Sequence, residues 1–394
     1  MKLIEGGICA VEGVKAWGIK PGKYGLAIII AKGDASGVFT RNKVIAAPLI
    51  ITKNQLSKHK KIHAVIANSG NANAFTGSKG FEDAANMVQL LSDKLSIEKD
   101  LIAVASTGVI GQRLDIQWIE NNIDGVIDNL GCEKECSTNA AKAIMTTDTT
   151  PKEIAIELES GIRIGGIAKG SGMIEPNMGT MLGFIYTDAK IDADILDTCL
   201  KNAVDLSFNM ISVDGDTSTN DMVLLTATSE KNINFDIKEF QKGLEFVLIE
   251  LAKKIVIDGE GATKLIEVQV INAKSKNDAR IAAKAVVRSP LVKTAFSGED
   301  ANWGRVVAAI GYSGAEVISE NISLSFSFDG KEEFFVEAGE VKELTTTLKN
   351  FQKEFVLQKE ICIKINLGLG KECATAWGCD LTCDYVKINA DYLT

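Results

Sequence analysis

The sequence predicts a mixed α/β protein, because short apolar runs that end in glycine-rich turns alternate with longer amphipathic stretches. With 394 residues, 46% of them hydrophobic and 24% charged, the chain has a globular composition and can bury two cores. Runs that are apolar on both faces dominate its first part, whereas runs that are apolar on one face dominate the last third. We therefore expect two domains, 1–272 and 273–394.

The first part of the chain predicts buried strands and one clear helix. Residues 25–30 and 64–67 are short, apolar and rich in β-branched side chains, as in strands that are covered on both faces. A helix is expected over 80–95, where apolar residues recur on one face. Residues 101–108 predict a further strand that ends in a turn.

The later elements change in character. A second helix is expected over 236–251, with Asp236 as its N-cap. Polar and apolar residues then alternate in 266–270, 322–328 and 361–365, which is typical of strands that are covered on one face only. This change places the domain boundary near residue 272.

Composition narrows the classes of function and partner. The 43 basic and 52 acidic side chains give a net charge of −9, which argues against a nucleic-acid partner. We find no apolar run long enough for a membrane span and no signal peptide, so a cytoplasmic location is expected. The 8 cysteines are then expected to be free thiols, and Cys379 and Cys383 lack the nearby histidine that would favour zinc.

Three segments resemble binding loops but lack the residues that these loops require. In 165–172, Lys169 precedes Gly170, whereas a phosphate loop needs glycine before lysine. In 368–373, a cysteine stands at the third glycine of the dinucleotide motif. Residues 214–225 lack the turn glycine and closing glutamate of a calcium loop, so we interpret 214–221 as a polar turn that shapes a pocket.

Both histidines, His59 and His63, lie in one basic stretch and are expected to be solvated. A chain without another imidazole is a poor candidate for a Ser-His-Asp or Cys-His site. A covalent enzyme with this composition would need another base, such as a lysine or the free amine of an N-terminal nucleophile.

The segment 169–184 combines many small and special residues and allows two interpretations. Its composition alone favours a surface loop that enters a strand at Thr180. Its chemistry suggests self-cleavage between Gly179 and Thr180, since glycine permits strained backbone and leaves its carbonyl open to attack. Cleavage would place a free amine beside the threonine hydroxyl, which supplies nucleophile and base together.

Residues 169–182, Lys-Gly-Ser-Gly-Met-Ile-Glu-Pro-Asn-Met-Gly-Thr-Met-Leu, resemble the self-cleavage motif of the ornithine acetyltransferase / glutamate N-acetyltransferase family of arginine biosynthesis. Two positions depart from the family pattern: Gly179 replaces an alanine, which should still permit cleavage, and Leu393 replaces an arginine. Further matching motifs extend from end to end of the chain, at 68–74, 106–111, 145–149, 213–221, 258–264, 300–305, 376–382 and 387–392.

The resemblance implies an αββα sandwich of N-terminal-nucleophile type with a smaller α/β domain at the C-terminus. It implies an acetyltransferase that moves acetyl from N-acetylornithine to glutamate by double displacement, without metal or organic cofactor. The partners would be these small molecules and the chain's own α and β fragments, assembled as α2β2. The sequence leaves open whether acetyl-CoA is also a donor, as in a bifunctional enzyme.

The resemblance also implies roles for particular residues. Thr180 would be the nucleophile with its own amine as base, while Thr107 and Gly108 would stabilise the oxyanion. We expect Lys169 to suit a substrate carboxylate and Glu260 an ammonium. Contacts at Asn389 and Thr394 would require the C-terminus to return to the site. The substrate contacts implied are Thr146, Lys169, Thr180, Glu260, Asn389 and Thr394.

Two other classes of function remain open at this point. An aminopeptidase or amidase could use the same self-cleaved fold, with water as the second acceptor. A non-catalytic binding protein would leave the chain uncleaved and form no acyl-enzyme.

Overall fold

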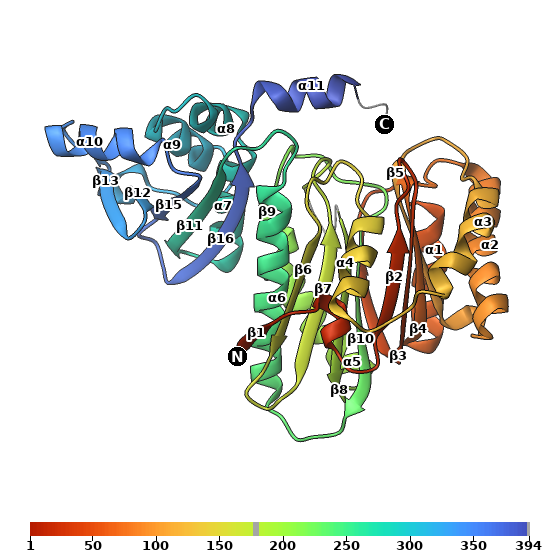
Figure 1. The fold of residues 1–394 in the computed structure, drawn as a ribbon. Coiled ribbons are helices and arrows are strands. Elements are labelled where there is room, and N and C mark those ends of the chain that lie inside the picture. The colour runs from red at the N-terminus through yellow and green to blue at the C-terminus, as the bar shows by residue number, and fades with distance from the viewer. Residues whose placement is uncertain (176–180, 392–394) are drawn as a thin grey trace. The chain divides into compact units, whose positions relative to one another are not determined.

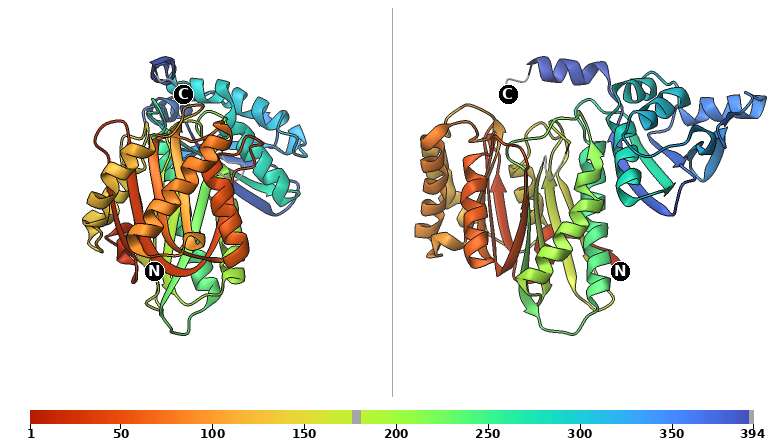
Figure 2. Two further views of the ribbon diagram at one scale, coloured as in Figure 1. Left: turned by 90° about the vertical axis from the view of Figure 1, so that its right-hand side faces the viewer. Right: turned by 180° about the vertical axis from the view of Figure 1, so that it is seen from behind.

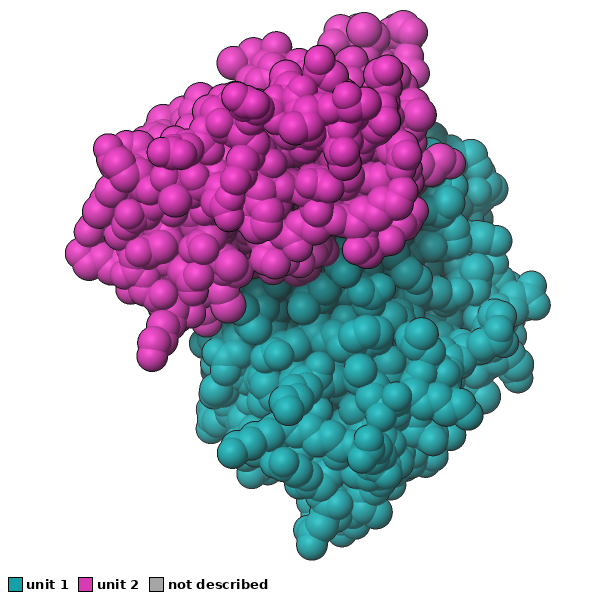
Figure 3. Space-filling model, turned by 90° about the vertical axis from the view of Figure 1, so that its left-hand side faces the viewer, with its two compact units in different colours: residues 1–209, 216–255, 393–394 teal, residues 210–215, 256–392 magenta. Residues whose placement is uncertain are grey.

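The computed structural model describes residues 1–175 and 181–391, which form two compact units (Figure 1, Figure 3). Unit 1 contains residues 1–209 and 216–255, and unit 2 contains 210–215 and the chain from residue 256 into the C-terminal helix. The domain boundary that the sequence predicts near residue 272 falls in a strand of unit 2. As a functional division, the two-domain scheme 1–272 and 273–394 stays a prediction.

The secondary structure up to residue 257 alternates strands and helices. Its elements are β1 (Lys2–Ile4), η1 (Gly7–Ala10), β2 (Lys15–Ile19), β3 (Gly25–Phe39), α1 (Ala47–His59), β4 (Lys61–Asn71), α2 (Gly77–Leu95), η2 (Lys99–Leu101), β5 (Ile102–Val109), α3 (Ile116–Ile127), α4 (Lys134–Ala143), β6 (Lys152–Glu157), β7 (Arg163–Lys169), β8 (Leu182–Ala189), α5 (Ala193–Leu206), η3 (Phe208–Met210), β9 (Ile211–Ser212), β10 (Met222–Lys231) and α6 (Ile237–Ile257).

Strand β3 joins two halves of the sheet in unit 1. The sheet has 9 strands in the order β1-β6-β7-β8-β10-β3-β4-β5, with β2 paired to β3. The first part of β3 pairs with β2 and β4, whereas its last part, from Asp34, pairs with β10. Between these parts lies Gly33, where a Cβ atom would stand 1.8 Å from the carbonyl oxygen of Ala227. Only glycine allows the two backbones to approach so closely. Beyond this point β3 pairs with β10, in the other half of the sheet.

The two halves form the inner layers of a four-layered αββα sandwich, with α1, α2 and α3 outside one half and α5 and α6 outside the other (Figure 2). Successive residues of β3 point to different cores: Ile29 joins an inner core with Phe184 of β8, and Ile28 an outer core with Met87 of α2. On the far side, a Cβ at Gly243 of α6 would touch side chains of β6 and β7. The αββα arrangement implied by the resemblance is therefore confirmed.

Helices predicted from periodicity are present, whereas several strands exceed their expected length. The helix expected over 80–95 is α2, and that over 236–251 is α6. The backbone N–H of Lys238 donates to Oδ1 of Asp236 at 2.9 Å, as expected for an N-cap. β3 continues nine residues beyond its predicted end at Ile30, because its polar residues still pair with a neighbouring strand.

Unit 2 is a smaller α/β layer structure. After β9, its sheet continues in elements from β11 onward, in the order β14-β13-β12-β15-β11-β16-β9. In β15 the isoleucines are buried and the residues between them are more exposed, which confirms the predicted one-sided strand. The elements are β11 (Leu265–Ala273), α7 (Lys276–Arg288), α8 (Pro290–Ser297), α9 (Trp303–Gly311), η4 (Ser319–Asn321), β12 (Ser323–Phe328), β13 (Lys331–Glu337), β14 (Glu340–Val341), α10 (Thr346–Phe355), β15 (Glu360–Asn366), β16 (Glu372–Cys379) and α11 (Cys383–Asp391).

None of the helices within 1–175 and 181–391 has the length and hydropathy that a bilayer-spanning segment requires.

Candidate active site

The candidate site in unit 1 lies where the parallel strands β4 and β5 end. Their pairing continues to Gly70 opposite Gly108 and then becomes irregular, because Asn71 pairs with both Thr107 and Val109. Gly108 has φ +133°, and a Cβ there would stand 2.3 Å from the carbonyl carbon of Gly70. Glycine is therefore required, and its conformation sets the course of the backbone just after Thr107.

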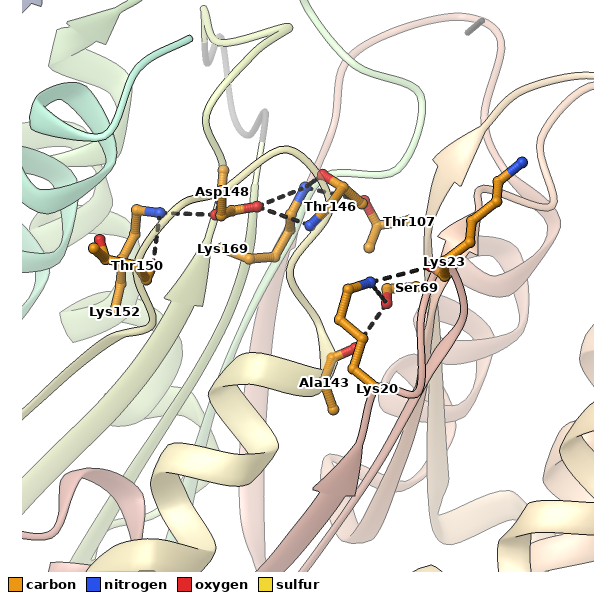
Figure 4. Close-up of polar contacts among 11 residues, drawn as sticks. Lys20, Lys23, Ser69, Thr107, Ala143, Thr146, Asp148, Thr150, Lys152 and Lys169 are labelled. Atoms are coloured by element: carbon orange, nitrogen blue, oxygen red, sulfur yellow. Dashed lines mark hydrogen bonds and ion pairs between the residues drawn. The ribbon is translucent and has the colours of Figure 1, made fainter. Parts of the chain in front are cut away.

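Lys169 brings together two threonines that are distant in sequence (Figure 4). It is the last residue of β7, and its Nζ donates to Oγ1 of Thr107 at 3.2 Å and to Oγ1 of Thr146 at 2.9 Å. Lys169 and Thr107 are both buried, so these hydrogen bonds are largely shielded from water. Three residues that the resemblance places in one site thus meet in the structure.

The buried carboxylate of Asp148 holds Lys169 and the backbone near Thr146 in place. Its Oδ1 accepts hydrogen bonds from Lys152 Nζ at 2.8 Å and from the backbone of Gly170 at 2.7 Å, and its Oδ2 accepts from the backbone of Thr146 at 2.9 Å. The Nζ of Lys169 is 3.9 Å from the same carboxylate. Asp148 therefore connects the loop that carries Thr146 with the end of β7.

Burial on its own would raise the pKa of Asp148, because it disfavours the charged form. The positive charges of Lys169 and Lys152 and the hydrogen bonds from Lys152 and Thr146 overcome this effect, so the pKa lies well below its ordinary value. Asp148 is thus a stable anion that holds two ammonium groups. It lies in the quoted motif 145–149, but the sequence analysis assigned it no role.

Asn220 ties the ends of β4 and β5 to the polar segment before β10. Its Nδ2 donates to the carbonyl oxygens of Ala72 at 2.6 Å and Ser106 at 2.8 Å. Within the segment, the hydroxyl of Thr219 donates to Oδ1 of Asn220, and the backbone of Asn220 donates to the hydroxyl of Ser218. The polar turn expected over 214–221 is therefore held in part by hydrogen bonds among its own residues.

Gly179, Thr180 and Thr394 lie outside the described residues. The chain on either side of 176–180 is anchored to the segment before β10: the backbone of Glu175 donates to the carbonyl of Asp216, and the carbonyl of Met181 accepts from the backbone of Met222. Glu175 and Met181 are both buried. For residues 170–175, the expectation of a surface loop is wrong, because none of them is exposed and the backbone of Ile174 pairs with Thr217.

Glu260 and Asn389 meet in unit 2. The side-chain amide of Asn389, on α11, donates to Oε2 of Glu260 at 2.7 Å. Gly261 has φ +68°, and a Cβ there would lie 2.5 Å from the backbone nitrogen of Tyr385, so the loop packs closely against the start of α11. The hydroxyl of Thr382 donates to the carbonyl of Gly261 at 2.7 Å and reinforces this contact.

The histidines differ from the expectation that both are solvated. His59 ends α1 with its imidazole 38% exposed, but His63 is half-buried in β4. Burial lowers the pKa of His63, and the charges of Lys32 and Lys61 lower it further. Neither histidine is part of the cluster at Lys169. In the described ranges, no group of three or more acidic, cysteine or histidine side chains is arranged to hold a metal ion.

The comparisons with a family model and with known proteins agree on one family. The ArgJ family model matches residues 11–394. The chain is 58% identical over 397 residues to a protein of Methanosarcina mazei named glutamate N-acetyltransferase, and the match covers 100% of both chains. It is 46% identical over 409 residues to the arginine biosynthesis bifunctional protein ArgJ of Streptococcus thermophilus, again over 100% of both chains.

A crystal structure of the arginine biosynthesis bifunctional protein ArgJ from Bacillus halodurans is 42% identical, covers 53% of this chain and 98% of its own, and has a TM-score of 0.49. Full-length agreement with the family model and with relatives well above 30% identity decides the assignment. On this evidence the chain belongs to the ArgJ family.

Proposed function

We propose that this protein is a glutamate N-acetyltransferase of arginine biosynthesis, which transfers acetyl from N-acetylornithine to glutamate through an acetyl-Thr180 intermediate. Names of the full-length relatives support the reaction class. The observation that carries the proposal is the cluster of Thr107, Thr146 and Lys169 at the strand ends. A biosynthetic enzyme of this kind would act in the cytoplasm.

The chemistry begins with self-cleavage between Gly179 and Thr180, which yields fragments 1–179 and 180–394 that we propose to assemble as α2β2. The hydroxyl of Thr180 then attacks the acetyl carbonyl, and its proton passes to the Thr180 amine. The carbon–nitrogen bond of N-acetylornithine breaks, ornithine leaves with that proton, and acetyl stays on the hydroxyl oxygen. Glutamate reverses these steps: its amine attacks the ester, the bond between the acyl carbon and the threonine oxygen breaks, and the proton lost by the amine passes through the Thr180 amine to that oxygen as N-acetylglutamate leaves.

Thr107 is suited to stabilise the oxyanion of both steps together with Gly108. Its oxygen accepts from the Lys169 ammonium, and among the described residues its hydroxyl hydrogen has no acceptor. The hydroxyl can therefore donate this hydrogen to the oxygen atom on which negative charge develops. The adjacent ammonium polarises the hydroxyl and strengthens the donor, because hydrogen bonds that involve charged groups are stronger than neutral ones.

We propose the substrate contacts that the family resemblance implies, each on the chemistry of its own side chain. Lys169 and Thr146 in unit 1 supply an ammonium and a hydroxyl for a substrate carboxylate, while Glu260, oriented by Asn389, supplies a carboxylate for an ammonium. We propose Thr394 as a further contact.

The test is incubation of the purified protein with N-acetylornithine and glutamate. The proposal predicts equal amounts of ornithine and N-acetylglutamate. Acetate release that does not depend on glutamate would instead favour an amidase, and an uncleaved chain without turnover would favour a binding protein. A separate assay with acetyl-CoA and glutamate decides whether the enzyme is bifunctional.

A further inference from the structure

A second lysine, Lys20, is held in place at the ends of the same strands. It follows β2 directly, and its Nζ donates to the hydroxyl of Ser69 at 3.0 Å and to the carbonyl of Lys23 at 3.1 Å. The hydroxyl of Ser69 in turn donates to the carbonyl of Ala143 at 2.7 Å, so its lone pair is directed to Lys20. Figure 4 shows these contacts beside the Lys169 cluster.

Ser69 lies between Lys20 and the cluster of Thr107, Thr146 and Lys169. It pairs with Thr107 in the parallel register of β4 and β5, and neighbouring strands are about 4.8 Å apart. Thr107 accepts from Lys169, so one ammonium group stands at each of two neighbouring strand ends. Ser69 is buried and Lys20 is half-buried, so the contact between them is partly shielded from water.

The balance of charge around Lys20 is positive. Among the described residues, no carboxylate lies within ion-pair distance of its Nζ, and its two acceptors are neutral. Burial lowers the pKa of Lys20 and the charge of Lys169 lowers it further, while Asp148 acts in the opposite direction. Asp148 is already shared between Lys152, at 2.8 Å, and Lys169, at 3.9 Å, so its charge compensates the Lys20 ammonium only in part. An anionic ligand would restore the balance.

We propose that Lys20, positioned by Ser69, binds the second carboxylate of the acetyl acceptor and makes the site selective for a dicarboxylic amino acid. The inference rests on the proposed function. An ammonium has three donors, of which Lys20 uses two toward the residues that the structure describes, so the third can bind a carboxylate oxygen. Lys169 then binds one carboxylate of the acceptor and Lys20 the other. Glutamine, with an amide in place of the side-chain carboxylate, would gain little from Lys20.

The experiment compares glutamate with glutamine as acetyl acceptor, by the ratio of their kcat/KM values. Replacing Lys20→Met should lower the preference for glutamate by about 10- to 100-fold, the size of effect expected for a charged hydrogen bond. Lys20→Arg keeps the charge and should retain most of the preference. Ser69→Ala should give an intermediate loss, since Lys20 then lacks one of its acceptors.

The matched control is Lys15→Met, which removes an exposed lysine from β2 and should leave the ratio unchanged. A folded Lys20→Met enzyme with the wild-type ratio would overturn the proposal. If that variant does not fold, Lys20→Gln, whose amide can still bond to Ser69, takes its place under the same criterion. Failure of the proposed function looks different, because wild-type enzyme would then form no N-acetylglutamate at all.

Discussion

The hydroxyl of Thr107 is the group in the described residues on which the proposed catalysis depends most. Replacing Thr107→Ala should lower kcat by roughly 10² to 10³ and leave KM nearly unchanged, because the hydroxyl acts mainly in the transition state. Thr107→Ser, the control, keeps the donor and should keep most of the activity. Steady-state kinetics with both substrates provide the measurement. Wild-type kcat in the alanine variant would assign Thr107 a purely structural role.

Asp148 provides a second prediction, which concerns stability. Asp148→Asn removes the anion between two buried ammonium groups and should lower the free energy of unfolding by about 3 to 5 kcal/mol. The pKa of Asp148 is depressed in the folded protein, so its stabilising effect is present above the unfolded value of about 3.9. The effect is lost as the pH falls from there toward the lowered folded pKa.

The measurement is denaturant unfolding of both proteins as a function of pH. Wild type should lose stability more steeply than Asp148→Asn below about pH 4, where the unfolded carboxylate takes up a proton and the folded one does not. Parallel curves for the two proteins would show that Asp148 does not stabilise the fold through its charge.

The pairing between the ends of β4 and β5 should be sensitive to the replacement of one glycine. Gly108→Ala places a Cβ against the backbone of Gly70 at φ +133°, so β5 must shift and move Thr107 with it. We expect loss of stability and of kcat together. Gly111→Ala is the matched control, since φ is also positive, +78°, but the added Cβ meets nothing within 4 Å.

The control should cost about 1 to 2 kcal/mol of stability from backbone strain alone, with kcat preserved. Thermal unfolding and kinetics of the two variants separate the effects. If both variants behave alike, the close approach at Gly108 does not govern the site.

Elements with a regular apolar period could be predicted from sequence, and others could not. Helices α2 and α6 follow from periodicity and, for α6, from the Asp236 cap. The sequence pattern does not predict strand β7, because its residues Gly165 and Gly166 are typical of a loop. In the structure these glycines admit neighbouring segments: a Cβ at Gly165 would lie 2.3 Å from the carbonyl oxygen of Gly7. Local sequence does not report such tertiary contacts.

The same limit applies to the candidate site. Thr107, Thr146 and Lys169 come from separate elements, and nothing in their local sequence predicts that they meet; only the family resemblance placed them together. The resemblance assigned no role to Asp148, which acts on Lys152 and Lys169 through charge and hydrogen bonds, or to Lys20, which we propose as a direct contact of the acceptor. Their importance becomes visible only once distances and burial are known.

The proposed self-cleavage divides the chain into two fragments, the second of which begins with Thr180. Thr180→Ala should prevent both cleavage and acetyl transfer, because the same hydroxyl serves both reactions. Thr180→Ser keeps a hydroxyl and should retain part of each. Gel analysis and the acetyl transfer assay report the two reactions separately. An active Thr180→Ala enzyme would exclude Thr180 as the nucleophile.

Mass spectrometry of the active enzyme after incubation with N-acetylornithine shows whether the acetyl group is carried by Thr180 of a cleaved chain. The account predicts fragments 1–179 and 180–394, with one acetyl group on Thr180 of the second fragment that disappears when glutamate is added. An active enzyme that consists only of the intact chain, or that carries its transferable acetyl group on another residue, would contradict the account.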